Sequence, residues 1–463
     1  MKLNKFMFRE YDLRGQFSKN ELNEKVALVL GKAYGTFLAK RKIDSAVVGV
    51  DSKTVSQKLK QPFIEGLLST GCNVTDIGIV LTPIFYFSQY YLKIKGGAMI
   101  SGSHNPGKWT GFKFANGLSK TLIQKEMQEL YKISVSGKFV KNEVGFLLKK
   151  EVISAYTKDL LKRVKIRKGV KIVVNAGNGT AGAIVPKILK KAGCRVIEQN
   201  CRLDDSYPHY NPDPSLTKMI ESTGMFVKKN RAEIGFAFDG DGDRLGITDE
   251  NGKTIWPDRY LILLARQMLK KKPKSKIVFD VKCSQALEED IRAHGGVPIM
   301  WKTGHSWIKE KMHKANAPLA GEMSGHVFYR EGYYGFDDAT FAALKMLEYC
   351  SAQNKKLSEL IKTTPYYIST PTIHLPCPDD KKYGVIKKVT REFKKEGYEV
   401  NDINGARVSF GDGWGLVRAS SNLPVLVMRF EAKTEKRLKE IEAVFKKKLS
   451  RFRSVSKKWK IGG

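Results

Sequence analysis

The sequence has few features that would tie the protein to a membrane, a zinc site or an oxidising compartment. Its six cysteines form no Cys-x-x-Cys pair and no disulfide-like spacing, which disfavours a structural zinc site and favours a reducing compartment. No apolar run approaches the roughly 18 residues that span a bilayer, and residues 1–15 contain no signal-peptide core. We therefore expect a cytoplasmic protein with no membrane partner.

Acidic residues are scarce relative to basic ones. The chain has 47 Asp and Glu residues against 82 Lys and Arg residues, which gives a net charge of +35. Such a charge suits nucleic-acid binding, but the excess lysine is spread over the whole chain and is dense only at residues 270–274 and 446–460. No Arg-rich helix, RNA-binding motif or zinc finger is present. We expect no nucleic-acid partner, and a surface that attracts small dianions.

The length and the hydrophobic pattern predict several globular domains. A chain of 463 residues with 42% hydrophobic residues is long enough for three or four domains. Short β-branched runs at residues 46–50, 171–174 and 276–279 are each followed by a loop of small or acidic residues and then by a helical pattern. This recurrence predicts three related α/β domains in series.

The last hundred residues show a different pattern. Strand-like segments at 370–376 and 425–430 precede a charged amphipathic helix over 434–449. These features predict an α+β domain at the end of the chain. The expected domains are α/β domain 1 over 1–149, α/β domain 2 over 150–252, α/β domain 3 over 253–366 and the α+β domain over 367–463.

Three aspartates alternate with glycines after the strand-like segment 234–238. Asp239, Asp241 and Asp243 would repel one another strongly without a cation, so the pattern predicts a metal site. A calcium-binding EF-hand is the alternative. An EF-hand loop needs glycine at its sixth position and follows a helix, whereas this chain has Arg244 there and a strand-like segment before the aspartates. A metal site beside a phosphate is therefore favoured.

A candidate nucleophile lies in the turn 101–106, which follows the small-residue strand 96–100. The turn is predicted to expose the hydroxyl of Ser103 and to direct backbone N–H groups towards an anion. A purely structural turn is the alternative interpretation.

Two later loops carry side chains suited to a sugar. Residues 303–305 and 321–326 each include a histidine that could transfer a proton near neutral pH. Glu322 and Ser324 occupy alternate positions and can both hydrogen-bond hydroxyl groups. Plain connecting loops are the alternative.

A polar segment near the C-terminus is suited to bind phosphate. Residues 413–424 place Arg418 and three small polar side chains, at 420–422, on a predicted loop between strands. An arginine can bind a dianionic phosphate through charge-assisted hydrogen bonds. A polar hairpin without a ligand is the alternative.

Taken together in their order along the chain, the motifs resemble the α-D-phosphohexomutase superfamily and, within it, the bacterial phosphomannomutase/phosphoglucomutase enzymes. The resemblance spans nearly the whole chain. The matching segments are residues 8–15, 103–106 with 111–113, 239–244, 301–305, 321–326, 335–338 and the Arg418 segment.

The resemblance implies four domains around a central cleft: three related α/β domains with mixed sheets and a C-terminal α+β domain. It implies that Ser103 is a phosphoserine and that Mg²⁺ is bound by Ser103, Asp239, Asp241 and Asp243. The implied catalytic residues are Ser103, Lys113, Arg244, His305 and His326. The implied substrate-binding residues are Tyr11, Arg14, Lys302, Thr303, Gly304, Glu322, Ser324, Arg418, Ser420, Ser421 and Asn422.

The activity implied by the resemblance is the interconversion of hexose 1-phosphate and hexose 6-phosphate. The sugar would be mannose or glucose, the enzyme a monomer, and hexose 1,6-bisphosphate both intermediate and activator. A phosphoglucosamine mutase, or a non-catalytic relative that binds sugar phosphates or nucleic acid, is the alternative.

This chain departs from the family pattern at two places. The family's phosphate loop commonly reads Arg-x-Ser-Asn-Thr, whereas residues 418–422 read Arg-Ala-Ser-Ser-Asn. The first-domain strand is usually followed by Asp-x-Arg, but here by Asp51-Ser52-Lys53, which replaces a forked donor by a point charge.

Overall fold

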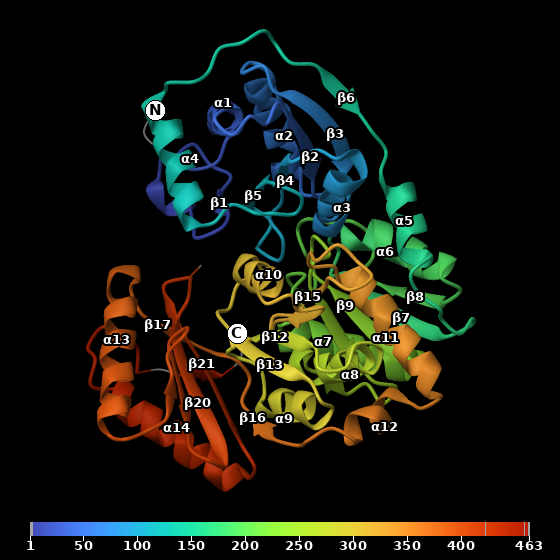
Figure 1. The fold of residues 1–463 in the computed structure, drawn as a ribbon, viewed down its shortest axis with the longest axis vertical. Helices are drawn as coiled ribbons and strands as arrows, with labels where there is room; N and C mark the ends of the chain where they lie inside the picture. The colour runs from blue at the N-terminus through green and yellow to red at the C-terminus, as the bar shows by residue number, and fades with distance from the viewer. Residues whose placement is uncertain (1–2, 422, 458, 462–463) are drawn as a thin grey trace. The chain divides into compact units, whose positions relative to one another are not determined.

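The computed structural model describes residues 3–421, 423–457 and 459–461, which form four β-sheets with flanking helices (Figure 1). The chain divides into two compact units. The first unit comprises residues 1–255 and 324–358, and the second comprises residues 256–323 and 359–463. Among the described residues, no helix is both long enough and apolar enough to span a membrane.

The first sheet contains parallel strands flanked by helices on both faces. Because successive side chains of a strand point to opposite faces, Gly96 and Gly97 of β4 show what covers each face. A methyl group at Gly96 would approach Leu38 of α1, and one at Gly97 would approach Phe85 of α3. The strand order is β1 (Leu13–Gln16), β5 (Trp109–Asn116), β4 (Gly96–Ile100), β2 (Ser45–Val50), β3 (Asn73–Ile79) and β6 (Leu147–Lys149), and the helices are α1 (Glu24–Ala39), α2 (Thr54–Leu68), α3 (Thr82–Leu92) and α4 (Gln124–Ser136).

The second sheet also belongs to the first unit. Of its parallel strands, β7 and β9 are buried and β8 is partly exposed, and helices connect them. The strand order is β11 (Thr254–Ile255), β10 (Leu245–Thr248), β9 (Ile234–Phe238), β7 (Lys171–Asn175) and β8 (Arg195–Gln199). The accompanying elements of the first unit are α5 (Ile153–Leu161), α6 (Ala181–Lys191), α7 (Thr217–Asn230), β15 (Val327–Tyr329) and α11 (Ala339–Gln353).

The second unit contains a third parallel sheet and an antiparallel C-terminal sheet. The strands of the third sheet that belong to this unit have the order β13 (Val297–Trp301), β12 (Lys276–Asp280) and β14 (Leu319–Gly321). Its helices are α8 (Pro257–Lys271), α9 (Gln285–Ala293) and α10 (His305–Lys314). The C-terminal sheet has the order β18 (Val400–Asn401), β19 (Ala406–Ser409), β20 (Gly413–Ala419), β21 (Val425–Ala432), β17 (Ile373–Pro376) and β22 (Lys460–Ile461). In addition, β16 (Ile368–Ser369) pairs with β21, and the helices are α13 (Asp379–Lys395) and α14 (Glu435–Leu449).

The first three sheets repeat one arrangement. A first strand (β2, β7 or β12) lies between a second (β3, β8 or β13) and a third (β4, β9 or β14), and all three run parallel. The loop after each third strand is residues 101–108, 239–244 or 322–326. The three candidate loops therefore occupy equivalent places, and the predicted fold class, three related α/β domains followed by an α+β domain, is confirmed.

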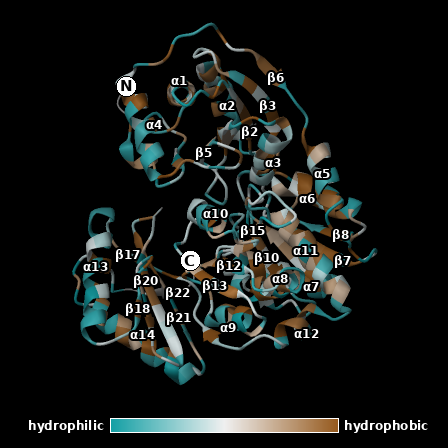
Figure 2. Ribbon diagram, in the orientation of Figure 1, coloured by the Kyte–Doolittle hydropathy of each residue, from teal (hydrophilic) through white to brown (hydrophobic). Residues whose placement is uncertain are grey.

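The hydrophobic pattern explains the layers. Strands such as β13 are hydrophobic, whereas α13 is largely hydrophilic (Figure 2). The C-terminal sheet packs its apolar face against one side of α13 and α14, through residues such as Val389 and Phe445, which are fully buried. Both helices carry their charged side chains on the opposite side, as period-3.6 amphipathic helices do.

Buried polar contacts join the C-terminal sheet to the third α/β domain within the second unit. Arg429 donates from Nη1 to Asp258 Oδ2 at 2.6 Å, and Glu431 accepts the backbone N–H of Gln285 at 2.8 Å. Arg407 donates to backbone carbonyls of the loop that follows β12. Since removing one partner of a buried charge pair is costly, these contacts hold the two parts of the unit together.

Candidate active site

The acidic loop joins β9 to β10, which run antiparallel. Within the turn, the Asp239 Oδ1 atom accepts hydrogen bonds from the backbone N–H groups of Asp243 (3.0 Å) and Arg244 (3.1 Å). Gly242 has a φ of +71°, which favours glycine. Because a strand lies on each side of the turn, the EF-hand alternative is excluded.

Three buried carboxylates face one another on this loop. One oxygen from each of Asp239, Asp241 and Asp243 lies within 4.8 Å of the others. Burial, together with the negative charges of Asp243 and Asp241, raises the pKa of Asp239 well above its usual range. The cluster is therefore short of positive charge.

Lys113 of β5 supplies one cation to the cluster. Its Nζ atom lies 2.9 Å from Asp241 Oδ2 and 2.5 Å from Asp243 Oδ2. Burial opposes the charge of Lys113, but the two carboxylates raise its pKa well above its usual range. Burial and the Asp243 charge also oppose ionisation of Asp241, yet Lys113 and the hydroxyl of Thr82 lower the pKa of Asp241 to about 2. Lys113 thus stays protonated and Asp241 stays ionised near neutral pH.

The donor set of this loop fits a divalent metal. Hard divalent cations prefer carboxylate oxygens, and three such groups converge here. Asp241 Oδ1 is buried, and no N–H or hydroxyl group of the described residues donates to it. The raised pKa of Asp239 indicates that Lys113 does not compensate all three charges. The loop is therefore able to hold a divalent metal.

The Ser103 side chain lies against the acidic loop. Its Oγ atom donates to Asp239 Oδ2 at 2.9 Å and lies 3.1 Å from His104 Nδ1. Ser103 has a left-handed φ of +47°, and its N–H donates to Ser101 Oγ at 2.8 Å. The side chain is buried, with 3% exposed, so the expectation of an exposed hydroxyl is wrong. The acidic loop packs closely on this residue: the Ser103 hydroxyl contacts Asp239, and a methyl group at Gly240 would lie only 2.4 Å from the Ser103 carbonyl oxygen.

Further basic groups of the first unit surround this serine. Arg244 Nη1 lies 3.6 Å from Asp213 Oδ2, and Arg14 donates from Nε to Asp12 Oδ2 at 2.6 Å. Burial and the charge of Arg244 lower the pKa of His104 to about 3, so His104 is neutral near pH 7. The predicted residue Tyr11 is buried next to this group, as its electrostatic coupling to Arg14 shows.

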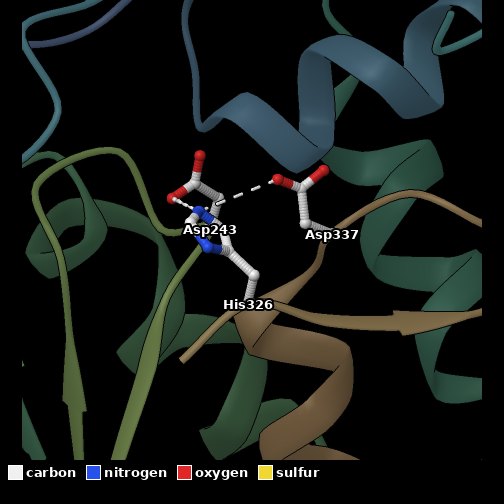
Figure 3. Close-up of side chains that lie close together, drawn as sticks. All are labelled: Asp243, His326 and Asp337. Carbon is white, nitrogen blue, oxygen red and sulfur yellow. Dashed lines mark ion pairs between the residues drawn. The ribbon is translucent and has the colours of Figure 1, made fainter. Parts of the chain in front are cut away.

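His326 lies beside Asp243 of the acidic loop (Figure 3). Its Nε2 atom is 3.3 Å from Asp243 Oδ1 and 4.0 Å from Asp337 Oδ2, while Nδ1 is 2.9 Å from Ser324 Oγ. Asp243, His326 and Asp337 are close enough to form a second potential metal-holding group. Because the two groups share Asp243, the second is an extension of the same site.

The predicted sugar-binding loops of the second unit are hydrogen-bonded into one structure. Gly304, with a φ of +128°, donates its N–H to Glu322 Oε1 at 2.5 Å. Thr303 Oγ1 donates to Asp280 Oδ2 at 2.7 Å, and the Met323 N–H donates to Asp280 Oδ1 at 2.9 Å. Asp280 therefore fixes one loop relative to the other.

Other groups of the second unit lie near these loops. His305 is buried and is the first residue of α10. Lys302 is half-buried, with Nζ 5.4 Å from the ring centre of Trp307. Lys282 Nζ lies 3.6 Å from Asp280 Oδ2, so a second ammonium group is present beside the Thr303 loop.

Arg418 lies on a strand, which corrects the expectation that it belongs to the following loop. β20 continues to Ala419, and Arg418 pairs with Val427 of β21. Its Nε atom donates to Asn404 Oδ1 at 2.8 Å, and the same oxygen accepts the Thr303 N–H at 3.2 Å. The sheet fixes the backbone of Arg418, and Asn404 connects its guanidinium group to the predicted sugar-binding loop.

The hairpin loop after Arg418 carries the other predicted phosphate ligands. Ser420 is buried, and its Oγ atom accepts the Leu423 N–H at 3.1 Å. Ser421 is half-buried, and Asn422 lies outside the described residues. Lys382 of α13 donates to the carbonyls of Ser420 and Leu423, so its ammonium group holds the backbone of the loop.

Three polar residues at these loops were missed by the sequence reasoning: Asp280, Lys282 and Asn404. A signal existed for the first two, because Asp280-x-Lys282 repeats the spacing of Asp51-x-Lys53 after the equivalent strand of the first domain. Asn404 had no such signal, because it reaches Thr303 only through tertiary folding.

Family models match successive parts of the chain. They describe phosphoglucomutase/phosphomannomutase alpha/beta/alpha domains I, II and III, at residues 5–141, 154–252 and 256–367. The C-terminal domain of the same family matches residues 373–448. Together these matches cover nearly all of the described chain.

Individual relatives agree with the family models. The chain is 39% identical over 445 residues to a phosphomannomutase/phosphoglucomutase of Pseudomonas putida, covering 96% of each chain. It is 39% identical over 443 residues to a phosphoglucomutase of Neisseria gonorrhoeae, covering 95% of this chain and 96% of that protein. A crystal structure of a phosphoglucomutase/phosphomannomutase family protein from Burkholderia thailandensis has a TM-score of 0.91 and 35% identity, covering 97% of this chain and 98% of that one. The chain therefore belongs to the phosphoglucomutase/phosphomannomutase family of isomerases.

Proposed function

We propose that this protein interconverts hexose 1-phosphates and hexose 6-phosphates of mannose or glucose. The single observation that carries the proposal is the 2.9 Å contact between Ser103 Oγ and Asp239 Oδ2, within a cluster of three buried carboxylates. A serine hydroxyl beside a metal-holding carboxylate group is the arrangement that phosphoryl transfer requires. The family membership points to the same reaction.

We propose that Asp239, Asp241 and Asp243 hold Mg²⁺ together with an oxygen of phosphorylated Ser103. When bound, the ion would neutralise charge on the phosphoryl oxygens. Ser103 already lies next to this group, and its strained φ of +47° fixes the direction of the side chain. The chain thus prepares the position of the phosphoryl group before substrate binds.

In the first half-reaction, the phosphoryl group passes from phospho-Ser103 to the free hydroxyl of a hexose 1-phosphate. The P–O bond to Ser103 breaks, and a P–O bond to the sugar oxygen forms. The sugar hydroxyl loses one proton, and the Ser103 oxygen takes up one to become a hydroxyl again. Lys113 is held protonated, so we assign it to charge stabilisation and not to proton abstraction. Arg244 would act in the same way, and His326 and His305 are the candidate proton acceptors.

The resulting hexose 1,6-bisphosphate must reverse its orientation before the second transfer returns a phosphoryl group to Ser103. Arg418, Ser420, Ser421 and Asn422 would hold the phosphate that is not reacting. Glu322 and Ser324 would hold sugar hydroxyls, with Lys302, Thr303 and Gly304 beside them. Tyr11 and Arg14 would contact substrate from the first domain. Arg418 is fixed by both its strand and Asn404, so it can bind either phosphate in turn.

A coupled assay of purified protein tests this proposal. We expect Mg²⁺-dependent turnover of mannose 1-phosphate or glucose 1-phosphate, and near-complete loss of turnover in Ser103→Ala. Glucosamine 1-phosphate as substrate separates the proposal from a phosphoglucosamine mutase. Preference for the amino sugar, or undiminished activity of Ser103→Ala, would contradict the proposal.

We further propose a monomeric cytoplasmic enzyme whose net charge of +35 attracts phosphosugars. Raising the salt concentration should then lower kcat/KM more than kcat, because screening weakens capture and not chemistry. Light scattering would give the oligomeric state. Sub-micromolar binding of nucleic acid at about 0.15 M salt that competes with turnover would favour a nucleic-acid partner instead.

A further inference from the structure

Lys53 is buried beneath the turn that carries Ser103. It follows β2, belongs to the departure Asp51-Ser52-Lys53, and has only 1% of its surface exposed. Its Nζ atom donates to the Asn105 carbonyl at 2.6 Å. It also lies 3.2 Å from the Trp109 carbonyl oxygen and 3.3 Å from that of Pro106. One ammonium group therefore connects three carbonyls on the C-terminal side of Ser103.

Asp51 holds the other side of the same turn. Its Oδ2 atom accepts the Gly102 N–H at 2.7 Å, and its Oδ1 atom accepts the Lys53 N–H at 3.0 Å. The two side chains thus hold Gly102, immediately before Ser103, and Asn105, two residues after it. Such bracketing matters because Ser103 has a left-handed φ of +47°, which a non-glycine residue adopts only when its surroundings impose it.

The space around the ammonium group is closely filled. A methyl group added at Gly102 would lie 2.5 Å from Lys53 Nζ, and the ring centre of Tyr207 is 5.2 Å from the same atom. A compact ammonium group can donate to several carbonyls that converge on one point, whereas a planar guanidinium group has its donors in a fixed fork. The small space and the converging carbonyls of this turn therefore suit a lysine at position 53.

We propose that Lys53 is a positioning residue for the phosphoryl-transfer reaction. It holds the turn 102–109 so that Ser103 Oγ faces the acidic loop, and it does so without touching the substrate. The inference rests on the proposed function, in which Ser103 carries the phosphoryl group. Loss of Lys53 frees the three carbonyls to reorient, and the Ser103 hydroxyl then leaves its place 2.9 Å from Asp239 Oδ2.

The test compares Lys53→Met and Lys53→Arg with the wild-type protein. The rate at which glucose 1,6-bisphosphate phosphorylates Ser103 is followed by intact-mass spectrometry in a single turnover, beside steady-state kcat and KM. We expect Lys53→Met to lower the phosphorylation rate and kcat by about tenfold to a hundredfold with KM within about threefold of wild type, because small displacements of a nucleophile are costly. Lys53→Arg should recover only part of the loss, because it keeps the charge but not donors that converge on one point.

A matched control separates positioning from general destabilisation. Leu130→Ala truncates a fully buried side chain of the same domain on α4. It should lower the melting temperature at least as much as Lys53→Met but leave the phosphorylation rate nearly unchanged. If Lys53→Met does not fold, Gly102→Ala gives a second test: its methyl group would lie 2.3 Å from the Trp109 carbonyl oxygen and 2.5 Å from Lys53 Nζ, so it should disturb the contact between them and slow the same step.

The outcomes distinguish this inference from the proposed function. Phosphorylation of Ser103 at the wild-type rate in a folded Lys53→Met or Gly102→Ala protein overturns the positioning role and leaves the proposed function standing. Failure of the wild-type protein to become phosphorylated at Ser103 overturns the proposed function itself. An equal loss in Leu130→Ala would show that the effect of Lys53 is only structural.

Discussion

The first and third α/β domains contain the same Asp-x-Lys turn after their first parallel strand. In both domains the aspartate accepts a backbone N–H from the loop after the third strand: Asp51 from Gly102 at 2.7 Å and Asp280 from Met323 at 2.9 Å. One of these loops carries the candidate nucleophile and the other the candidate sugar ligands. The repeated aspartate is therefore a common device for holding a functional loop.

The two lysines of these turns differ in what they contact. Lys53 donates to backbone carbonyls of its own domain, whereas Lys282 lies 3.6 Å from the Asp280 carboxylate beside the Thr303 loop. In the proposed mechanism, one lysine supports the turn of the candidate nucleophile, and the other adds a cation beside the predicted sugar-binding loop. The comparison predicts that changes on the nucleophile side lower kcat, while changes on the sugar side act mainly on substrate binding.

The largest effect is expected at the acidic loop. Asp241→Asn removes one charge with little change in volume, so the fold should persist. Because metal-assisted charge stabilisation contributes several kcal/mol, we expect kcat to fall by about a hundredfold or more. Calorimetry should show weaker Mg²⁺ binding to Asp241→Asn. A chelator should abolish the activity of the wild-type enzyme, and added Mg²⁺ should restore it. Activity that does not change when a chelator is added would show that the acidic loop does not hold a catalytic metal.

Arg418→Ala tests the sugar side. A hydrogen bond to a charged group contributes roughly 1.5–3 kcal/mol, so kcat/KM should fall by about tenfold to a hundredfold. Weaker binding during reorientation should also release hexose 1,6-bisphosphate and make turnover depend on added bisphosphate. Ser421→Asn, which restores the commoner family residue, is the matched control and should change kcat/KM by less than about tenfold.

A wild-type KM in Arg418→Ala, with no need for added bisphosphate, would show that this strand does not hold the phosphate.

Lys282→Met tests whether the two lysines have different roles. We expect KM to rise by about tenfold with kcat nearly unchanged, since the lost ammonium group would bind substrate and transition state alike. This is the opposite of the split expected for Lys53→Met. Steady-state kinetics of the two variants, measured side by side, give kcat and KM for each. If both variants change kcat and KM in the same way, the two lysines do not have separate roles.

The last prediction concerns stability and not catalysis, at Asp338, which follows Asp337 in the sequence. Burial raises the pKa of Asp338 to about 6, although Tyr333 and Tyr156 donate hydrogen bonds to it. The ordinary value is 3.8, so its contribution to stability is complete below about pH 4 and is lost as the pH rises to about 6. The unfolding free energy of wild type should fall relative to Asp338→Asn by up to about 3 kcal/mol across this window.

Urea melts of both proteins at several pH values would measure this difference. A difference that does not change with pH would show that Asp338 is already ionised throughout.

Local pattern predicted most of the fold. The runs at 46–50, 171–174 and 276–279 became β2, β7 and β12, because short β-branched segments followed by helices leave few other arrangements. The helix expected over 434–449 is α14, at Glu435–Leu449. The four domain boundaries remain predictions, since the two compact units divide the chain differently.

The sites were predicted less completely, because their geometry depends on contacts that are distant in sequence. The burial of Ser103 accompanies its contact with the acidic loop, which lies more than a hundred residues further along the chain. The strand position of Arg418 results from pairing with β21. The carbonyl contacts of Lys53 could not be inferred from the turn Asp51–Lys53 alone, because they need the loop after β4 folded above it.

The central claim is that Ser103 carries the phosphoryl group that moves between the two ends of the sugar phosphate. The most direct test labels the enzyme with radioactive glucose 1,6-bisphosphate, maps the label, and then adds unlabelled glucose 1-phosphate. The account predicts label on the peptide that contains Ser103, and its transfer to the sugar within one turnover. Label at another residue, or label on Ser103 that substrate does not remove, would contradict it.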